Sequence, residues 1–285
     1  MKVLVVGGGQ LAWDLMQTAP AGVHVTMAGR DELDITLSDA CEYVLQGRRP
    51  EVVINAAAYT AVDKAESERE AAFAVNEQGV ANLAAACQSV RARLFHVSTD
   101  FVFDGQGNRP YVPDDAANPP SVYGASKLAG ETVLRRQLPG SVIVRTSWLY
   151  SRNGGNFVKT MLRLMAEKPS LNVVVDQLGA PTWAAGLAGA LWSAIEREVP
   201  GGIYHWSDAG VASWYDFAVA IQDIALELGI LDSAIPIRPI PSSEFPTPAK
   251  RPAYSVLDTR STQEAFGLEA VHWRRQLKSM LETLP

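Results

Sequence analysis

The sequence predicts an α/β fold, a doubly wound parallel sheet with helices on both faces, and three observations lead to it. First, short apolar runs rich in β-branched residues recur at Lys2–Val6, Val23–Ala28, Val52–Ala56, Leu94–Ser98 and Val142–Arg145. Second, these runs do not alternate polar with apolar residues, which is typical of parallel strands buried on both faces. Third, the stretches between them, such as Glu66–Val90, have the apolar spacing of helices. Strands that alternate with helices in this way indicate an open parallel sheet.

The pattern loosens after about Trp148, and the second half predicts a smaller lobe interleaved with the sheet. Its spacing indicates helices and strands in turn, at Asn156–Glu167, Leu171–Val175, Trp183–Glu196, Gly202–Trp206 and Ser213–Leu228, the last with Ser213 as N-cap. Ile235–Pro252 contains six prolines and should be largely irregular. We therefore expect one domain over residues 1–150, a lobe mainly over residues 151–285, and a return to the sheet at about residues 171–206.

Composition and charge exclude several classes of protein. The chain has 285 residues, 47% of them hydrophobic, and a net charge of −6, which suits a globular protein and disfavours a nucleic-acid binder with a basic face. Its two cysteines give no disulfide framework, and its four histidines share no spacing typical of metal ligands. The first apolar run is far shorter than the ~18 residues of a membrane span and lacks a signal-peptide cleavage site. We expect a cytoplasmic protein with no membrane partner and no metal site.

A glycine turn follows the first predicted strand and opens a helix. Gly7, Gly9 and Ala12 match the pattern G-x-G-x-x-[GA], with Gln10 and Leu11 at the start of the helix. Glycines at these places permit the tight turn and let backbone N–H groups approach a pyrophosphate at the positive end of the helix. A glycine triplet alone also fits a flexible turn, but its place after the first strand indicates a Rossmann-like dinucleotide site in residues 1–150.

The end of the second predicted strand bears on which dinucleotide binds. The sequence there is Ala28-Gly29-Arg30-Asp31. An arginine at this place accommodates the 2′-phosphate of NADP, whereas an acidic residue binds the ribose 2′-OH of NAD. Because Arg30 comes first, we expect NADP(H). Asp31 and Asp34 keep NAD(H) as the alternative, and Arg30 also fits an ordinary exposed turn.

Tyr123 and Lys127 form the candidate catalytic pair. They lie four residues apart, and so on one face of a helix, and Tyr123 is the only one of eight tyrosines with lysine at this spacing. A tyrosine with a pKa of about 10 is a poor proton donor, but a nearby ammonium and an oxidised nicotinamide favour the phenolate and lower that pKa. The pair can then hand a proton to a carbonyl oxygen as hydride reaches its carbon. The spacing alone is also common on surface helices.

Thr99 strengthens the pair. Ser98-Thr99-Asp100 ends the fourth predicted strand, at the carboxyl edge where open sheets bind their ligands. A hydroxyl there can donate to a substrate carbonyl and hold it against the tyrosine; as an alternative, Thr99 only caps the strand. The glycine turn, Thr99 and the Tyr123/Lys127 pair, in this order, indicate a nicotinamide-dependent reductase.

These motifs, together with longer stretches, resemble the extended short-chain dehydrogenases/reductases and, among them, the dTDP-4-dehydrorhamnose reductase family. The matching stretches cover most of the chain, and several lie in the predicted smaller lobe, so the resemblance extends to the class of substrate. They are Asn55–Glu66, Val75–Asn76, Ser98–Gly105, Tyr123–Glu131, Arg145–Tyr150, Asn156–Arg163, Asp176–Thr182, Ser213–Phe217 and Thr247–Pro252.

The resemblance implies reduction of the C4 carbonyl of a dTDP-4-keto-6-deoxyhexose, with dTDP-4-dehydro-L-rhamnose giving dTDP-L-rhamnose as the first expectation. It implies a catalytic set of Thr99, Tyr123 and Lys127. The nucleotide-sugar substrate would contact Phe101, Trp148 and Arg251. The cofactor would contact Gly7, Gly9, Gln10, Leu11, Arg30, Asp34, Ile35, Ala57, Ala58 and Tyr59.

Some implications of the resemblance stay open. From the residues alone, Trp148 also fits a core aromatic and Arg251 a surface ion pair. Some family members dimerise around Mg²⁺, so a homodimer is one expectation, but no metal position maps onto this chain.

The chain departs from the family pattern at three places. Its glycine turn is one residue shorter and ends in Ala12, Phe101 replaces a tyrosine, and Tyr254 stands where asparagine is frequent. Phe101 removes a hydroxyl that could touch the sugar, so a 4-ketoreductase of another deoxysugar pathway is a second hypothesis. It also disfavours a 4,6-dehydratase, which has glutamate there. An intact catalytic set argues against a non-catalytic relative, such as the regulatory subunit of methionine adenosyltransferase.

Overall fold

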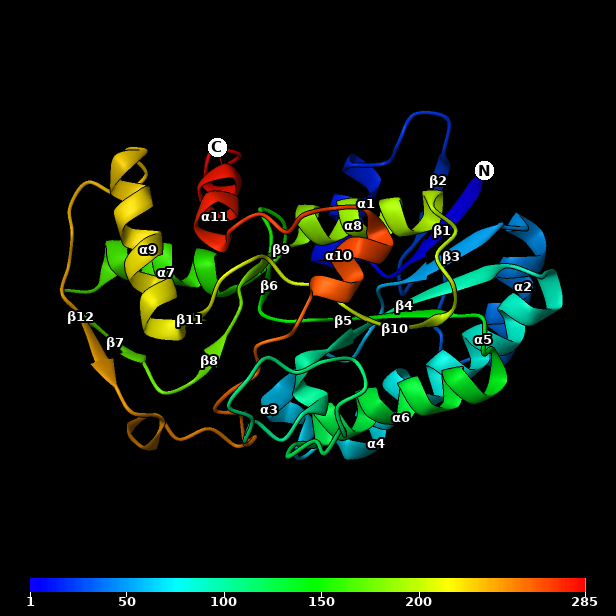
Figure 1. The fold of residues 1–285 in the computed structure, drawn as a ribbon, viewed down its shortest axis with the longest axis horizontal. Helices are drawn as coiled ribbons and strands as arrows, with labels where there is room; N and C mark the ends of the chain where they lie inside the picture. The colour runs from blue at the N-terminus through cyan, green and yellow to red at the C-terminus, as the bar shows by residue number, and fades with distance from the viewer. Residues whose placement is uncertain (285) are drawn as a thin grey trace.

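The computed structural model describes residues 1–284 and has a six-stranded parallel sheet at its centre (Figure 1). Along the sheet the strands run in the order β10-β5-β4-β3-β1-β2. Their bounds are β1 Lys2–Val6, β2 His24–Ala28, β3 Val52–Asn55, β4 Arg93–Thr99, β5 Val142–Thr146 and β10 Gly202–His205. The chain starts at β1, adds β2 on one side and returns to the other side at β3, so the strand order reverses between β1 and β3. The doubly wound parallel sheet predicted from the sequence is confirmed.

Helices cover both faces of the sheet, as Figure 1 shows. α1 (Gln10–Gln17) and α8 (Ala184–Glu196) pack together on one face, and α2 (Ser38–Arg48), α5 (Gly79–Val90) and α6 (Val122–Gln137) cover the other. Each face has its own apolar core. Val3 and Val5 of β1 enter the first core, and Leu4 and Val6 enter the second. Because successive residues of a strand point to opposite faces, strands buried on both faces read as continuous apolar runs.

A smaller lobe is built from later segments of the chain. α7 (Phe157–Glu167), α9 (Trp214–Glu227) and α11 (Trp273–Leu281) enclose a core of their own around Phe217 and Leu277. Two-stranded pairs accompany them: β6 (Leu149–Tyr150) with β9 (Thr182–Trp183), β8 (Leu178–Gly179) with β11 (Ala212–Ser213), and β7 (Leu171–Val174) with β12 (Ile237–Ile240). β10 and α10 (Arg260–Phe266) lie between these segments in the sequence but pack with the large sheet, so the lobe is interleaved with it.

The first turn of α9 has the predicted cap. Ser213 Oγ accepts from Asp216 N, and the Asp216 carboxylate accepts from Ser213 N, which together form a capping box. The helices at residues 157–167 and 184–196 begin one residue later than the sequence predicted, whereas the helix at residues 214–227 begins directly after its predicted cap. In each case the predicted first residue is the N-cap, which has extended backbone angles.

The segment Ile235–Pro252 is less irregular than predicted, because β12 forms beside β7. Pro239 lies opposite Val173 in this pair. A two-stranded pair has only edge strands, where the missing N–H of proline is tolerated. Of the span at about residues 171–206 that we expected to return to the sheet, β10 lies in the sheet, whereas β7 pairs with β12 in the smaller lobe.

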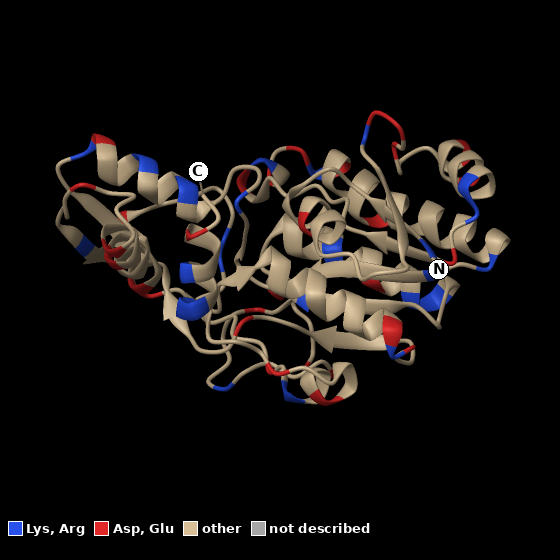
Figure 2. Ribbon diagram, turned by 90° about the horizontal axis from the view of Figure 1, so that it is seen from above, with Lys and Arg blue, Asp and Glu red and all other residues tan. Residues whose placement is uncertain are grey.

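Charged side chains are spread over both lobes. Figure 2 shows Lys and Arg interspersed with Asp and Glu rather than gathered on one face. Among residues 1–284, none of the helices combines the length and apolar character that crossing a membrane requires.

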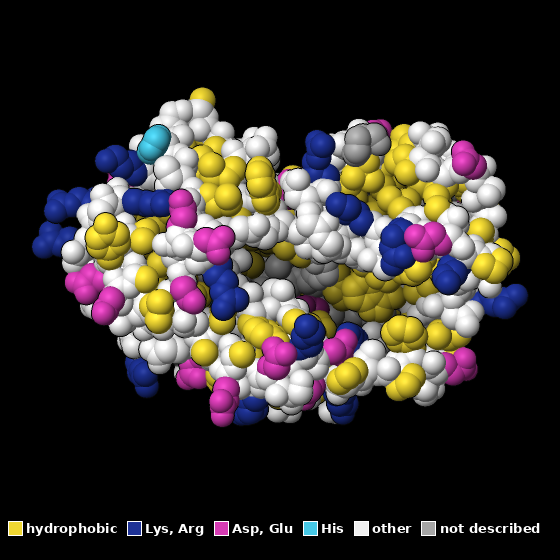
Figure 3. All heavy atoms as spheres, turned by 180° about the vertical axis from the view of Figure 1, so that it is seen from behind, with side chains coloured by type: hydrophobic (Ala, Val, Ile, Leu, Met, Phe, Trp, Pro, Cys, Tyr) yellow, Lys and Arg dark blue, Asp and Glu magenta, His cyan; other side chains and the backbone are white. Residues whose placement is uncertain are grey.

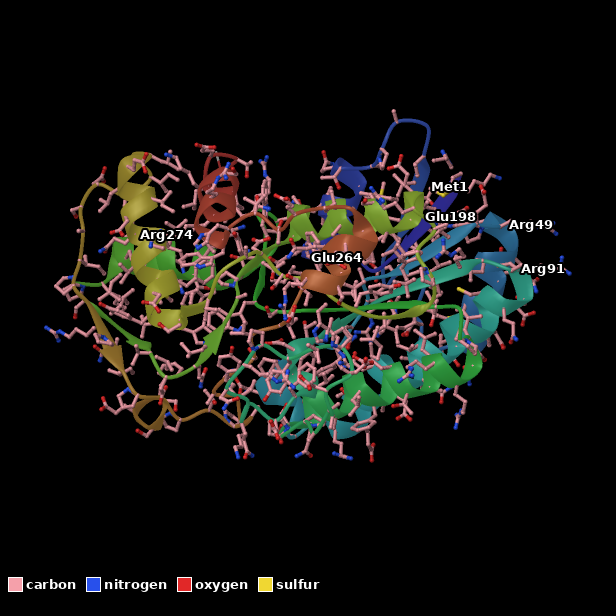
Figure 4. The ribbon with its side chains drawn as sticks, in the orientation of Figure 1. Met1, Arg49, Arg91, Glu198, Glu264 and Arg274 are labelled. Atoms are coloured by element: carbon pink, nitrogen blue, oxygen red, sulfur yellow. The ribbon has the colours of Figure 1, made fainter. Side chains whose placement is uncertain are left out.

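Non-glycine residues with positive φ fall at opposite edges of the sheet. Arg49, Arg91 and Glu198 follow α2, α5 and α8 and precede β3, β4 and β10, so they lie at the amino edge. Figure 4 shows them at the end of the molecule away from the smaller lobe. A left-handed residue is a frequent way to end a helix. Trp148 also has positive φ, at 45°, but it follows β5 at the carboxyl edge and ends no helix.

A π turn, η1 (Ala74–Gln78), separates α4 (Arg69–Phe73) from α5 and carries Asn76 into contact with α6. Asn76 Nδ2 donates to Ser126 Oγ on α6 at 2.9 Å and to Tyr59 O at 3.1 Å, while its Oδ1 accepts from Tyr59 N at 2.9 Å. The close approach depends on Gly130, since a Cβ there would collide with Asn76 O. One asparagine therefore joins the segment after β3 to helix α6.

We expect Gly130→Ala to lower the free energy of unfolding by about 1–3 kcal/mol, because the added methyl group overpacks the contact between α6 and η1. Gly189→Ala on α8 is the matched control, because among residues 1–284 no atom beyond its chain neighbours and its own helix backbone lies within 4 Å of its Cβ position. Alanine there favours the helix by up to ~1 kcal/mol. Urea denaturation of both variants measures the two changes, and equal stability of the two would contradict the tight contact at Gly130.

Candidate active site

Loops from four strands meet at the carboxyl edge of the sheet. Gly7–Gly9 follow β1, Ala56–Tyr59 follow β3, the 3-10 turn Asp100–Val102 follows β4, and Ser147–Trp148 follow β5. Parallel strands end side by side, and the reversal of strand order between β1 and β3 opens a crevice at this edge. Figure 3 shows the molecule hollowed between the two lobes, with hydrophobic side chains on the wall of the hollow.

Helix α6 presents Tyr123 in its first turn. Ser121 caps the helix through its Oγ, which accepts from Gly124 N at 3.2 Å. Gly124 is required here, since a Cβ would collide with Phe101 O in the turn after β4. The helix start therefore packs directly on that turn. The rings of Phe101 and Tyr123 lie edge to face, with 5.6 Å between their centroids.

The phenol of Tyr123 is protonated at neutral pH. Burial raises the pKa of Tyr123 to about 12, and the charge of Asp100 acts in the same direction, while the Thr99 hydroxyl, within hydrogen-bonding reach, acts against both. The sequence led us to expect that Lys127 lowers this pKa. In the protein alone the direction is the opposite, because burial disfavours the phenolate.

The hydroxyl of Thr99 is held at the end of β4. Its Oγ1 donates to Asp100 Oδ1 at 3.0 Å and accepts from Phe101 N at 3.2 Å. Asp100 is 2% exposed, and burial raises the pKa of its carboxyl to about 6. The single proton of the Thr99 hydroxyl must therefore turn from Asp100 before it can reach a bound ligand.

Lys127 lies one turn after Tyr123 on α6, and it is 2% exposed. Its Nζ donates to Val97 O at 2.8 Å and lies 3.3 Å from His96 Nε2, so these partners are both on β4. Burial lowers the pKa of Lys127 to about 8, and the Glu131 carboxylate opposes this shift. The structure brings the three predicted catalytic side chains together where β4 meets α6.

A buried ion pair ties this junction to the sheet. Arg145 on β5 binds Glu131 on α6 through Nη2–Oε2 at 2.7 Å and Nε–Oε1 at 3.0 Å, and both residues are at most 3% exposed. Ser98 Oγ donates to the same carboxylate at 2.5 Å. Ser98 adjoins Thr99, and Glu131 lies one turn after Lys127. The carboxylate therefore fixes β4 and α6 to one another beside the three side chains.

The glycine turn is closely packed at its start and open at its end. Gly7 has φ 120°, and a Cβ there would crowd the backbone of Ala56 and Ala57. Gly9 is the N-cap of α1, with no side-chain cap and no atom within 4 Å of its Cβ position. Within residues 1–284, the first amides of α1 are therefore not capped by a side chain.

The side chains of Gln10 and Leu11 are already engaged within the protein, so their main-chain groups are what they can offer a ligand. Gln10 Oε1 accepts from Asn156 Nδ2 at 2.9 Å, which ties α1 to the segment before α7. Leu11 is 4% exposed and packs in the core between the sheet and α8.

The residues after β2 differ in how far their side chains are held by contacts within the protein. Arg30 is exposed, and no ion pair within residues 1–284 involves it. The Asp34 carboxylate accepts from Thr36 N at 2.9 Å and from Thr36 Oγ1 at 2.7 Å, and these bonds lower its pKa. Ile35 is buried against Gly79. Of the three, Arg30 has the side chain that is open to a ligand.

The segment after β3 is held by two buried asparagines. Ala57 N donates to Asn55 Oδ1 at 3.0 Å, and Tyr59 N donates to Asn76 Oδ1 at 2.9 Å. Ala58 lies between these two anchors. The Tyr59 hydroxyl turns to the surface and donates to Glu68 Oε2 at 2.6 Å.

Trp148 belongs to an aromatic stack between the sheet and the smaller lobe. Its ring is stacked on Trp214, with 3.6 Å between centroids and 3° between planes. Phe157 packs against Trp214 in turn. Gly179 leaves room for the Trp148 indole, which a Cβ would meet. Trp148 is half-buried, so its ring is both part of this core and accessible at its rim.

Arg251 forms an ion pair that joins the two parts of the molecule. Its Nη1 and Nη2 each donate to the Asp63 carboxylate at 2.9 Å, and Ala249 N donates to the same group at 3.2 Å. Asp63 lies on α3 (Val62–Ala65), next to the segment after β3. In the protein alone, Arg251 therefore makes an ion pair, which the sequence left open as the alternative to a substrate contact.

The similarity to known proteins extends over nearly the whole chain. The family described as RmlD substrate binding domain matches residues 1–285. The chain belongs to this family. This RmlD-type chain is 42% identical to the dTDP-4-dehydrorhamnose reductase of Aggregatibacter actinomycetemcomitans, over 98% of each protein. It is also similar to the solved dTDP-4-dehydrorhamnose reductases of Clostridium acetobutylicum (TM-score 0.93, 40% identity, 99% of each chain) and of Bacillus anthracis in complex with NADP (TM-score 0.93, 36% identity, 99% and 98%). The resemblance drawn from the motifs is confirmed.

We expect Glu131→Gln to lower the free energy of unfolding by about 3–5 kcal/mol, because it leaves the Arg145 guanidinium buried without a counter-charge. The control is Glu167→Gln on α7, which removes the exposed i,i+4 pair with Arg163 and should cost less than about 0.5 kcal/mol. Thermal and urea unfolding measure both. A Glu131→Gln protein as stable as the control would contradict the role given to the buried pair.

Proposed function

We propose that this chain reduces the C4 carbonyl of a dTDP-4-keto-6-deoxyhexose with NAD(P)H, and that it converts dTDP-4-dehydro-L-rhamnose to dTDP-L-rhamnose. The observation that carries the proposal is the junction of β4 with α6, where Thr99, Tyr123 and Lys127 meet at the same sheet edge as the glycine turn. Near-full-length similarity to proteins named dTDP-4-dehydrorhamnose reductase supports the same substrate class.

The glycine turn and its neighbours fit a dinucleotide. The uncapped amides at the start of α1, in Gly9, Gln10 and Leu11, suit a pyrophosphate. Gly7 keeps the turn free of a side chain. Arg30, Asp34 and Ile35 would hold the adenosine half, and Ala57, Ala58 and Tyr59 would line the nicotinamide half. When bound, a nicotinamide cofactor supplies the hydride.

The side chains at the junction supply and restore the proton. Tyr123 gives its proton to O4 of the sugar as hydride reaches C4, so the carbonyl becomes an alcohol and the phenol becomes a phenolate. Thr99 donates to the same oxygen once its hydroxyl proton turns from Asp100. Lys127 has a pKa of about 8, so it can release and regain a proton near neutral pH and restore the phenol.

The hollow between the lobes would receive the nucleotide sugar. Phe101, in the turn after β4, and Trp148, in the loop after β5, would border the sugar. The Arg251 guanidinium would hold the diphosphate. It would exchange the Asp63 carboxylate for phosphate oxygens, and a planar guanidinium binds both groups with two parallel hydrogen bonds.

A second candidate is a 4-ketoreductase of another deoxysugar pathway, and Phe101 favours it. The ring lies edge-on against Tyr123 and offers the sugar no hydroxyl at this wall. Product stereochemistry distinguishes the two reductases, so a panel of 4-keto-sugar nucleotides with NMR of the products decides between them.

We expect Arg30→Ala to lower kcat/KM for NADPH by about 10- to 100-fold, the equivalent of one charge-assisted hydrogen bond to the 2′-phosphate. The value for NADH should change little, because NADH has no phosphate there. Steady-state assays with both cofactors give the ratio, with Arg136→Ala at the exposed end of α6 as the control. An equal loss with both cofactors would contradict a preference for NADP(H) set by Arg30.

We expect Tyr123→Phe to reduce turnover by at least about 10²-fold, because general acid catalysis of this kind contributes that much. The affinity for NADPH, measured by fluorescence titration, should be unchanged, since the ring remains. Tyr43→Phe, on the exposed face of α2, is the control and should be fully active. Near-normal turnover of Tyr123→Phe would contradict the mechanism.

A further inference from the structure

A chain of buried polar groups runs from Lys127 across β4 to the segment after β3. Lys127 Nζ lies 3.3 Å from His96 Nε2, His96 Nδ1 lies 3.1 Å from Asn55 Nδ2, and Asn55 Oδ1 accepts from Ala57 N at 3.0 Å. His96 and Asn55 are fully buried and lie opposite each other in the register of β4 with β3. The segment that would line the cofactor is therefore connected to the lysine through groups that do not meet solvent.

The main-chain N–H of Ala57 determines the orientation of the Asn55 side-chain amide. It donates to Asn55 Oδ1, so the amide turns Nδ2 toward His96, because the flipped amide would set two donors against one another. His96 Nδ1 is therefore an acceptor. Burial is the largest of the causes that lower the pKa of His96 well below its ordinary value, so the ring is neutral. Its one proton then lies on Nε2, which faces Lys127.

A donor at Nε2 matches an uncharged amine and not an ammonium. An ammonium has three donors and no acceptor, whereas the lone pair of an amine accepts Nε2–H while an amine N–H still donates to Val97 O. We propose that His96 is a positioning residue that stabilises the uncharged form of Lys127 through Nε2–H, so that the lysine readily gives a proton to the Tyr123 side of the site. The purpose of this contact rests on the reductase function proposed above.

The proton balance of the step is simple. After reduction Tyr123 is a phenolate. The ammonium of Lys127 loses one proton, and the phenolate oxygen gains one, so the phenol is restored and the lysine becomes an amine. The amine regains a proton from water before the next turnover. The imidazole gains and loses no proton. It donates Nε2–H to the amine that the transfer leaves behind, and so makes the transfer more favourable.

The other titratable groups around Lys127 are spread over several elements. On its own helix Glu131 favours the ammonium, but its carboxylate is bound to Arg145 of β5 and Ser98 of β4. Tyr123 is a neutral phenol, and Asp100 after β4 acts on that phenol. On the side of α3, Glu66 binds Val122 N at the exposed start of α6, and η1 presents the uncharged Asn76. Within residues 1–284, His96 is the titratable side chain that lies within hydrogen-bonding distance of Lys127 Nζ.

A titration of the free protein tests the proposal without turnover. NMR of ¹³Cε-labelled lysine, with Lys127→Arg to identify the signal, gives the pKa of Lys127 in each variant. We expect His96→Phe to raise that pKa by about one unit, the size of a hydrogen bond to a charge-changing group, with His96→Gln in between. His24→Phe is the control, since it makes the same substitution at an exposed residue of β2, the edge strand on the far side of β3 and β1 from β4. It should leave the titration of Lys127 unchanged.

The imidazole itself provides the second measurement. Long-range ¹H–¹⁵N NMR of the unmodified protein should place the His96 proton on Nε2. In turnover, His96→Phe should lower kcat several-fold near neutral pH and leave KM for both substrates unchanged. A proton on Nδ1, or a pKa of Lys127 that stays the same or falls in His96→Phe, overturns the proposal. If His96→Phe does not fold, His96→Gln and the proton position decide. Failure of every keto-sugar nucleotide to oxidise NADPH would instead overturn the proposed function, and the titrations would stand.

Discussion

The buried ion pair between Glu131 and Arg145 is the contact on which the geometry of the site depends. It connects α6 to β5 and, through Ser98, to β4, in an interior where the loss of one partner leaves a charge without compensation. On the opposite side of α6, Asn76 and Gly130 hold the helix against η1. The helix that carries the tyrosine and the lysine is thereby fixed to β4, β5 and η1.

Most of the large sheet was predictable from the sequence, because strands buried on both faces leave short apolar runs, and the alternation of these runs with helical spacing indicates a parallel sheet. The helices of the smaller lobe were predictable from their spacing and, in α9, from the cap at Ser213. β12 was not, because a pair of two short strands is decided by what lies beside it, and its prolines indicate a loop. The π turn at Asn76 was not predicted either, because it spans only five residues inside the stretch Glu66–Val90, whose spacing indicates helix throughout.

The site was predictable where the chemistry follows chain spacing. A tyrosine and a lysine one helical turn apart, a glycine turn and a strand-end threonine are local patterns, and the structure brings the tyrosine, the lysine and the threonine together where β4 meets α6. His96, Asn55 and Trp214 were not singled out, because each is one polar or aromatic residue in an apolar context whose partner lies far along the chain. The direction in which the pKa of Tyr123 shifts was also not predicted, because spacing indicates the neighbouring lysine charge but not the burial that outweighs it.

The position of β10 has a consequence for how the protein is made. β10 is the outermost strand on one side of the sheet, beside β5, yet α7, β7 and α8 all precede it in the sequence. During synthesis, the outer edge of β5 stays without a partner until these elements have left the ribosome. An open edge of apolar strand is a surface on which nascent chains associate. The order of segments thus places completion of the sheet after α8, and the edge of β5 is open while α7, β7 and α8 are being translated.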